Sequence, residues 1–239
     1  KSPVTMWWSF VKLPITAFET VHDLQEAKNI DQSRLAASQL NAPGINIAYG
    51  DKDGNIAVWA CAKLPVYPSG MNSKLIADGS NAAFDLVNFY PFNNNPHREN
   101  PACGFVYTSN DDAGPVNGKS YPGYYPPIVR AQRVLGLLSA DSLMTIADMA
   151  RIQNDVLSAR HAAISSVLAS EIKLTNQVIP EEKYALELLK SWNGNHGLND
   201  KAPVIYYALL WKTIQYMMQD ELGEADLDRK STRLNSSHI

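Results

Sequence analysis

An asparagine lies inside a stretch that otherwise has the composition of a β-strand. Asn46 is flanked by Ile45 and Ile47, and the stretch leads into an Asp-Lys-Asp-Gly-Asn cluster at residues 51–55. Asparagine is depleted from strands because its side-chain amide competes with the backbone for hydrogen bonds. Asn46 therefore indicates either a local turn or a side chain with a chemical role.

The cluster that follows Asn46 could bind a cation or form a turn. Asp51, Asp53 and Asn55 alternate as ligands do in a calcium-binding loop, but the further carboxylates and the closing glutamate of such a loop are missing. The same residue types are typical of tight turns. We therefore predict a β-hairpin over residues 45–64, with its turn at residues 51–55.

Other reactive side chains lack the spacing that their chemistry requires. The segment from Gly114 to Ser120 has three residues between its glycines where a phosphate-binding loop needs four, and no Gly-x-Ser-x-Gly nucleophile motif occurs. The adjacent Asp111 and Asp112 would point apart on a strand, so we expect them to be solvated in a loop. Zinc-ligand spacing is also absent, which predicts packing or surface roles for His22, His97, His161 and His196.

Cysteines and aromatic residues are expected to have structural roles. Cys61 and Cys103 are too few for a disulfide framework, and neither lies in a Cys-x-x-Cys pair. Cys61 lies in an apolar stretch, which predicts an inert buried thiol. The Trp7-Trp8 pair and the tyrosine-rich segments are expected to pack in the core and loops rather than to form a ligand platform.

Composition excludes two classes of partner. The 239 residues are 45% hydrophobic and 19% charged, and the formal net charge is -3. This balance offers no basic surplus for a nucleic acid backbone. No apolar run approaches the roughly 20 residues of a membrane-spanning helix. We expect a water-soluble globular protein with neither nucleic acid nor membrane as a partner.

The first half of the chain is predicted to hold strands and loops. Residues 6–11 are aromatic and β-branched and predict a buried strand. Residues 17–40 predict helix, with Asp31 as an N-cap. Residues 65–127 are rich in Pro, Gly, Asn and Tyr, so loops should dominate, with one further strand at residues 104–109.

The second half is predicted to be helical. Apolar residues recur at helical spacing at Ile146, Met149, Ile152 and Val156. Another helix should follow Pro180, and a last helix should span residues 203–222 and end at Gly223. Strands followed by helices predict an α+β class, with no repeat and no linker between independent domains.

The two ends of the chain indicate part of a longer protein. Lys1-Ser2-Pro3 is neither an initiator methionine nor the start of a signal peptide. Residues 228–239 lack periodicity and resemble the conceptual translation of a sequencing-library adapter. We expect residues 1–227 to be a fragment of a single domain and residues 228–239 to be an artefactual tail, the alternative being a disordered native tail.

Five segments, taken in order, resemble the β subunit of the penicillin acylase family. They are the hairpin Ile45–Ile56 with Lys63-Leu64-Pro65, then Tyr90-Pro91-Phe92, Asn100–Asp111, Arg130–Val134, and Ala147–Asp155 with its Gln-Asn-Asp end. The resemblance covers about residues 6–222. It departs at Tyr67, near which some members carry an arginine, and at Ala57, where a glycine is usual.

The resemblance implies an N-terminal nucleophile hydrolase with a four-layer αββα fold. In this family, excision of a spacer exposes a serine, upstream of Lys1 here, whose α-amine acts as the base. A strand asparagine helps to hold the oxyanion, and Asn46 matches it; one such donor is worth about 3 kcal/mol. The alternative for Asn46 is a hairpin-edge residue bonded to nearby backbone. Tyr49 and Trp59 are weaker candidates, as supports for the hairpin.

The expected parent is an amidohydrolase of linear amides, and the isolated fragment should be inactive. Its substrates would be N-acyl molecules such as penicillins or acyl-homoserine lactones, and its partners the α subunit and the rest of the β subunit. The alternative is a non-catalytic scaffold of the same fold. No cofactor is expected; calcium, bound by some members, has no identifiable ligand set here. The family implies a periplasmic or secreted location.

Overall fold

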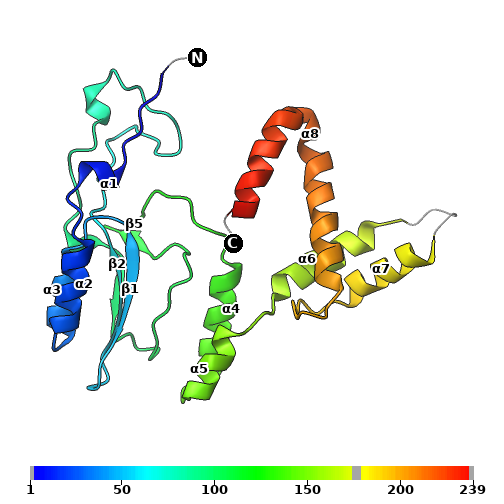
Figure 1. Ribbon diagram of the computed structural model, residues 1–239, viewed down its shortest axis with the longest axis horizontal. Coiled ribbons are helices and arrows are strands. Elements are labelled where there is room, and N and C mark those ends of the chain that lie inside the picture. Colours follow the sequence, from blue (N-terminus) through cyan, green and yellow to red (C-terminus); the bar gives the residue numbers. More distant parts are fainter. Residues whose placement is uncertain (1–2, 174–178, 237–239) are drawn as a thin grey trace. The chain divides into compact units, whose positions relative to one another are not determined.

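The chain divides into two compact units, Lys1–Thr145 and Ile146–Ile239, and the computed structural model describes the backbone of residues 3–173 and 179–236. Figure 1 shows strands and helices in the first unit and helices in the second. Each unit is built around its own apolar cluster. This distribution of elements agrees with the predicted α+β class.

The predicted hairpin is present. Strands β1 (Ile45–Gly50) and β2 (Ile56–Cys61) pair in antiparallel register. Asp51 organises the turn, because its Oδ1 accepts the backbone N–H of Asn55 at 2.9 Å. Gly54 has a φ of 86°, in the left-handed region that favours glycine. The prediction of a turn at residues 51–55 is confirmed.

One face of the sheet is covered by helices. Strand β3 (His97–Glu99) pairs with β2, which gives the order β1-β2-β3. Helices α2 (Ala17–Glu26) and α3 (Ile30–Ser38) lie side by side next to the hairpin (Figure 1), and α3 contacts β2. Because strand side chains alternate, every second residue of β2 joins the buried cluster Ala37, Leu40, Ala57, Trp59 and Cys61.

The helical segment before the hairpin starts differently from the prediction. It forms two helices, and Asn29 rather than Asp31 caps the second. Asn29 is extended, with φ -158°, and its side chain accepts the backbone N–H of Gln32 at 3.0 Å. Asp31 lies in the first turn, where its carboxylate bonds to Arg34 at 2.9 Å. A negative charge at this position interacts favourably with the positive end of the helix dipole.

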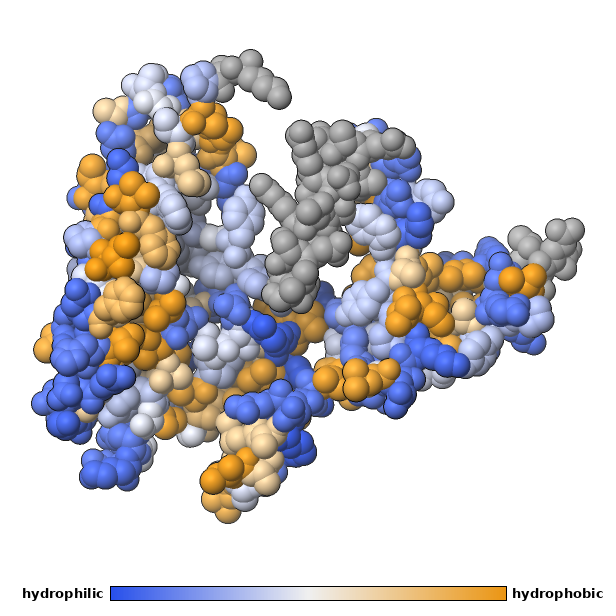
Figure 2. Space-filling view, in the orientation of Figure 1, coloured by the Kyte–Doolittle hydropathy of each residue, from blue (hydrophilic) through white to orange (hydrophobic). Residues whose placement is uncertain are grey.

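The strand predicted at residues 6–11 is wrong. A short helix, α1 (Ser9–Lys12), occupies part of this segment, and the backbone N–H groups of Val11 and Lys12 bond to the carbonyl of Trp8. Met6 is 77% exposed and Trp8 50% exposed. Figure 2 shows apolar side chains gathered at the surface of the first unit. A strand needs a neighbouring strand for its backbone hydrogen bonds, and the segment has bonded locally instead.

The strand predicted at residues 104–109 is also wrong. The backbone N–H of Ser109 bonds to the carboxylate of Asp111 rather than to a neighbouring strand. Strands β4 (Pro115–Val116) and β5 (Lys119–Ser120) form a short hairpin further on. Its two turn residues, Asn117 and Gly118, have φ of 50° and 75°, the geometry of a two-residue hairpin turn. The segment 114–120 is therefore a hairpin and not a phosphate-binding loop.

Short helical elements complete the first unit. They are the 3-10 turns η1 (Ala82–Phe84) and η2 (Phe92–Asn94) and helix α4 (Val129–Leu138). Loops dominate residues 65–127, as predicted.

In the described part of the chain, no helix is both long enough and apolar enough to cross a bilayer.

The second unit consists of helices packed around aromatic residues. The helices are α5 (Ile146–Gln153), α6 (Ala159–Glu171), α7 (Pro180–Ser191) and α8 (Ala202–Ser236). Helix α7 begins at Pro180 as predicted. Ile146 is 91% exposed, so the apolar face predicted for α5 is not buried at that residue. The buried cluster of this unit is Ala169, Leu186, Leu189, Trp192, Ala202 and Tyr206.

Helix α8 extends beyond its predicted end. Gly223 interrupts the helix with φ 67° and ψ 165°, and the backbone is helical again as far as Ser236. A glycine at a helix end commonly adopts this positive φ, so the position of the break was predicted correctly, but the end of the helix was not. The artefactual origin of residues 228–239 stays a prediction, and residues 237–239 lie outside the described chain.

Candidate active site around Asn46

Asn46 projects from the sheet face opposite the helix-covered one. It lies across from Ala60, one position out of phase with the buried Trp59 and Cys61. Because neighbouring strand residues point to opposite faces, the Asn46 side chain faces away from the α3 core, and it is exposed. A backbone held in an antiparallel ladder fixes the origin of this side chain, so only its own rotamer remains to be set.

The Asn46 amide bonds to a residue far away in the sequence. Its Nδ2 donates a hydrogen bond to Thr108 Oγ1 at 2.7 Å, across a separation of 62 residues. A primary amide carries two N–H donors, and Thr108 takes one of them. The bond links the strand to the segment that follows β3.

A hollow opens beside this pair. It is small, with a volume of about 20 Å³, which is room for about one water molecule. Apolar, polar and charged side chains from β1, β2, β3 and the segments on either side of β3 surround it: Asn46, Val58, Ala60, Pro96, His97, Arg98, Tyr107, Thr108, Asp111, Asp112 and Ala113. The hollow is too small to enclose a substrate by itself, but a polar donor at its wall could contact a polar atom of a molecule that lies against this face of the sheet.

The segment that carries Thr108 is held on both sides. Asp111 accepts hydrogen bonds from the Tyr107 hydroxyl and the Ser109 backbone N–H, each at 3.2 Å. Arg130, at the start of α4, donates to the Ser109 carbonyl and to Asn110 Oδ1, each at 2.5 Å. Two of the five segments that carry the family resemblance, Asn100–Asp111 and Arg130–Val134, therefore meet next to Thr108.

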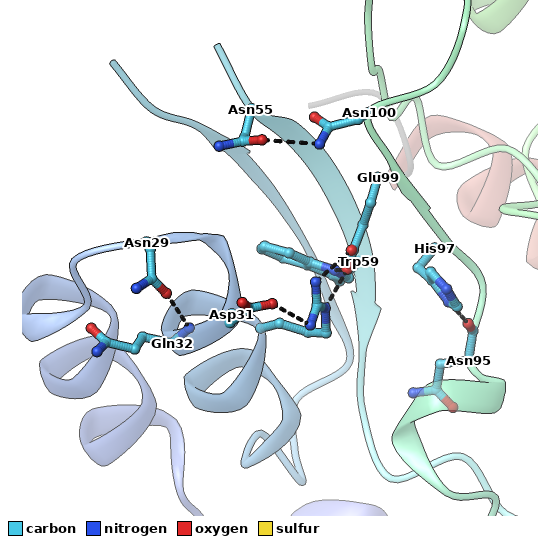
Figure 3. Close-up of polar contacts among 10 residues, drawn as sticks. Asn29, Asp31, Gln32, Asn55, Trp59, Asn95, His97, Glu99 and Asn100 are labelled. Atoms are coloured by element: carbon cyan, nitrogen blue, oxygen red, sulfur yellow. Dashed lines mark hydrogen bonds and ion pairs between the residues drawn. The ribbon is translucent and has the colours of Figure 1, made fainter. Parts of the chain in front are cut away.

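A partly buried polar network holds β3 in place. The Glu99 carboxylate, next to the Trp59 ring in Figure 3, accepts from the Trp59 indole at 2.7 Å. It also accepts from the Arg34 guanidinium of α3, whose Nη2 lies at 2.6 Å. These hydrogen bonds, led by that of Arg34, lower the pKa of Glu99. The same contact raises the pKa of Arg34. The chain entering the Thr108 segment is thus fixed to both the helix and the sheet.

Two asparagines secure the ends of β3. Before it, the buried Asn95 donates to the carbonyls of Ala60 and Ala62 at 3.0 and 2.9 Å. After it, Asn100 accepts the backbone N–H of Ile56 at 2.9 Å and donates to Asn55 at 3.0 Å (Figure 3). These contacts tie β3 to both ends of β2.

The other residues considered in the sequence lie elsewhere or have other environments. The rings of Tyr49 and Trp59 are 5.7 Å apart on the helix-covered face, so they contact the hairpin and not the hollow. Ala57 is fully buried, and Tyr67 packs on Tyr121 at 6.0 Å between ring centroids. None of these four contributes a side chain to the hollow around Asn46.

Asp111 and Thr108 are site residues that the sequence did not identify. Asp111 was expected to be solvated in a loop; it lies in a loop, but its carboxylate is bonded and it lines the hollow with Asp112. The only signal in the sequence was their place in the segment Asn100–Asp111. That segment resembles the family, but the resemblance does not show which residues it contacts.

The structure confirms the predicted burial of Cys61 and shows the surroundings of two of the histidines. Cys61 is buried, and burial raises the pKa of its thiol to about 12. His161 and His196 lie in the second unit, where the Tyr207 hydroxyl is 3.2 Å from His161 Nδ1 and 3.1 Å from His196 Nε2. Among the described residues, no group of three or more His, Cys, Asp or Glu side chains is arranged to hold a metal ion.

Comparison with known proteins identifies the family. The sequence model of the penicillin amidase family matches residues 1–238. The acyl-homoserine lactone acylase QuiP of Pseudomonas aeruginosa is 24% identical over 217 residues, which cover 85% of this chain and 25% of that protein. The thermostable penicillin G acylase of Alcaligenes faecalis has 20% identity and a TM-score of 0.63 over 88% of this chain and 38% of its own.

The structural match confirms the predicted N-terminal nucleophile hydrolase fold. The chain spans about a quarter of the length of the curated relative and less than two fifths of the solved structure. Because the family match extends over nearly all of its residues, the chain belongs to the penicillin amidase family.

Proposed function

We propose that the chain is part of an acylase precursor and supplies Asn46 as a hydrogen-bond donor to the oxyanion of amide hydrolysis. The observation that carries the proposal is the Asn46 amide itself, which is exposed on a paired strand, at the wall of a hollow and held by Thr108. An N–H held in place before the reaction can stabilise developing negative charge without reorganising. The family match supports the reaction type.

In the proposed reaction, a serine outside this chain is the nucleophile. Its oxygen forms a bond to the amide carbon while its own α-amine takes the hydroxyl proton. Asn46 donates to the oxygen that becomes negative, the C–N bond breaks, and the leaving amine accepts the proton. Water then attacks the acyl-serine ester by the same route and releases the acid. Asn46 contributes in both steps, because each passes through a tetrahedral oxyanion.

The proposed substrates are small N-acyl molecules. Two relatives act on such compounds according to their names, one on penicillin G and one on acyl-homoserine lactones. We propose that the α subunit and the remainder of the β subunit complete the site, that the mature enzyme is exported, and that the chemistry needs no cofactor. Cell fractionation, and activity after exhaustive chelation, would test the last two points.

The test uses the intact precursor with Asn46→Ala and Asn46→Asp, assayed on N-phenylacetyl and N-acyl p-nitroanilides of graded chain length. Both variants should mature into two chains and lose about 100- to 1,000-fold in kcat, with a much smaller change in KM. Asn154→Ala is the matched control. Its side-chain amide lies outside the hollow and donates to the Ala150 carbonyl of α5.

Two outcomes would contradict the proposal. If Asn46→Ala retained the kcat of the wild-type enzyme, Asn46 would be only a hairpin residue. If the intact protein matured or bound acyl compounds without hydrolysing any of the amides, the alternative of a non-catalytic scaffold would replace the acylase.

A further inference from the structure

The geometry points to Thr108 as a positioning residue for Asn46. We infer that its hydroxyl oxygen holds one N–H of the Asn46 amide and thereby directs the second N–H into the hollow. This inference rests on the proposed function, because it assigns Thr108 an effect on catalysis that acts through Asn46. Nothing in the spacing of the sequence connects these two residues.

The strand by itself leaves the amide orientation open. The ladder of β1 and β2 fixes the Asn46 backbone opposite Ala60, but the terminal torsion of asparagine has a broad energy profile. Rotation about that torsion exchanges the carbonyl oxygen and the NH2 group, and only the NH2 group can donate to an oxyanion. In the structure the NH2 group lies on the Thr108 side, where Thr108 Oγ1 accepts one of its N–H groups at 2.7 Å.

The backbone on either side of Thr108 is held by contacts of its two neighbours. Tyr107 and Ser109, its two neighbours, both bond to the Asp111 carboxylate. The Ser109 carbonyl also accepts from Arg130 at 2.5 Å, and Ser109 is buried. An exposed hydrogen bond contributes more when its partners are ordered beforehand, because little conformational entropy is lost when it forms.

The contact leaves the amide able to act on a substrate. Thr108 Oγ1 engages one of the two N–H donors of Asn46, so the other remains for the oxyanion. Both residues line the same hollow. Valine has nearly the shape of threonine but no acceptor oxygen, and serine keeps the oxygen without the methyl group. These substitutions separate the hydrogen bond from the shape of the side chain.

The experiment measures kcat and KM of the intact, matured protein with Thr108→Val, Thr108→Ser and Asn46→Ala, and with Asn46→Ala and Thr108→Val combined. Thr108→Val should lower kcat about 10-fold with little change in KM, and Thr108→Ser should restore most of it. In the Asn46→Ala background, Thr108→Val should have no further effect, because the group it positions is gone. Thr213→Val in α8, whose hydroxyl bonds to the Leu209 carbonyl, is the control and should keep wild-type kcat.

Each failure has a separate meaning. Unchanged kcat in Thr108→Val, or the same loss with and without Asn46, would overturn the role of Thr108 while leaving Asn46 catalytic. Wild-type kcat in Asn46→Ala would instead overturn the proposed function. If Thr108→Val did not mature, Thr108→Ala would replace it: a loss of about 10-fold in kcat that is absent in Thr108→Ser supports the hydrogen bond, and an unchanged kcat contradicts it.

Discussion

Arg34 and Glu99 form a two-bond ion pair that joins helix α3 to strand β3 across the sheet, with Nη2 of Arg34 2.6 Å from Oε2 of Glu99. The Trp59 indole donates to the same carboxylate at 2.7 Å. Both charged side chains are partly shielded, with exposed fractions of 34% and 23%. Three hydrogen bonds on one carboxylate anchor β3, an edge strand of the sheet, to α3 and to β2.

Removing this carboxylate should destabilise the first unit. Glu99→Ala leaves the Trp59 N–H and the Arg34 guanidinium without their acceptor, which should lower the free energy of unfolding by about 1–3 kcal/mol. Urea unfolding followed by tryptophan fluorescence measures the change. Asp53→Ala is the matched control, since its pair with Lys52 is exposed and should contribute less than about 1 kcal/mol. An equal effect of the two variants would contradict the assigned role of Glu99.

Stability should fall as the pH is lowered into the acid range. The pKa of Asp51 is held at about 2, below its ordinary value of 3.8, chiefly by the Asn55 side-chain amide, and that of Glu99 is also lowered. Between the folded and the unfolded pKa the unfolded chain binds more protons, so protonation favours unfolding. Unfolding midpoints measured from pH 6 to pH 2 should therefore decrease below about pH 4.5, and Asp51→Asn should flatten the curve. A midpoint that rose on acidification would contradict this sign.

Gly194 should not tolerate a side chain. Its φ is 92°, and an added Cβ would lie 2.2 Å from the Ser158 carbonyl oxygen. The two backbone segments lie close together here because Leu157 and Asn195 form an antiparallel bridge. Gly194→Ala should cost at least about 1–3 kcal/mol in unfolding free energy. Gly136→Ala in α4 is the opposite case, since nothing lies within 4 Å of its added Cβ, and it should gain about 0.5–1 kcal/mol. Thermal unfolding of the two variants compares them directly.

The Tyr206 hydroxyl is buried without a hydrogen-bond partner among the described residues. Tyr206→Phe should therefore leave stability unchanged or raise it by about 1 kcal/mol, because the desolvated hydroxyl is removed and the ring stays. Tyr206→Ala should lose about 3–5 kcal/mol, since the ring packs on Trp192 at 5.2 Å. Calorimetry of both variants is the measurement. A loss in Tyr206→Phe comparable to that in Tyr206→Ala would show that the hydroxyl does have a stabilising contact.

Local signals predicted several elements because the residues that determine them are adjacent. The turn at residues 51–55 forms through Asp51 and its own neighbours, and helix α7 begins where Pro180 and two glutamates meet the preferences of a first turn. The order of the motif segments also predicted the family and its fold, since both were confirmed by comparison over nearly the whole chain.

Elements that depend on distant partners were not predicted. Residues 6–11 have strand composition, but composition cannot supply the neighbouring strand that a ladder needs, and part of the segment is helical. Asp31, in the first turn of α3, bonds to Arg34, and Arg34 also bonds to Glu99, 65 residues further on, a contact that no local pattern indicates.

The candidate site was likewise predictable from the sequence only in part. The sequence by itself determined that an asparagine lies on a hairpin strand, since alternation and turn chemistry are properties of neighbouring residues. Only the tertiary structure decided that this asparagine meets Thr108, and that Asp111 and Arg130 hold the segment that presents Thr108. Such contacts depend on how sheet and loops pack, and packing energy is shared among residues far apart in the chain, so no local pattern records it.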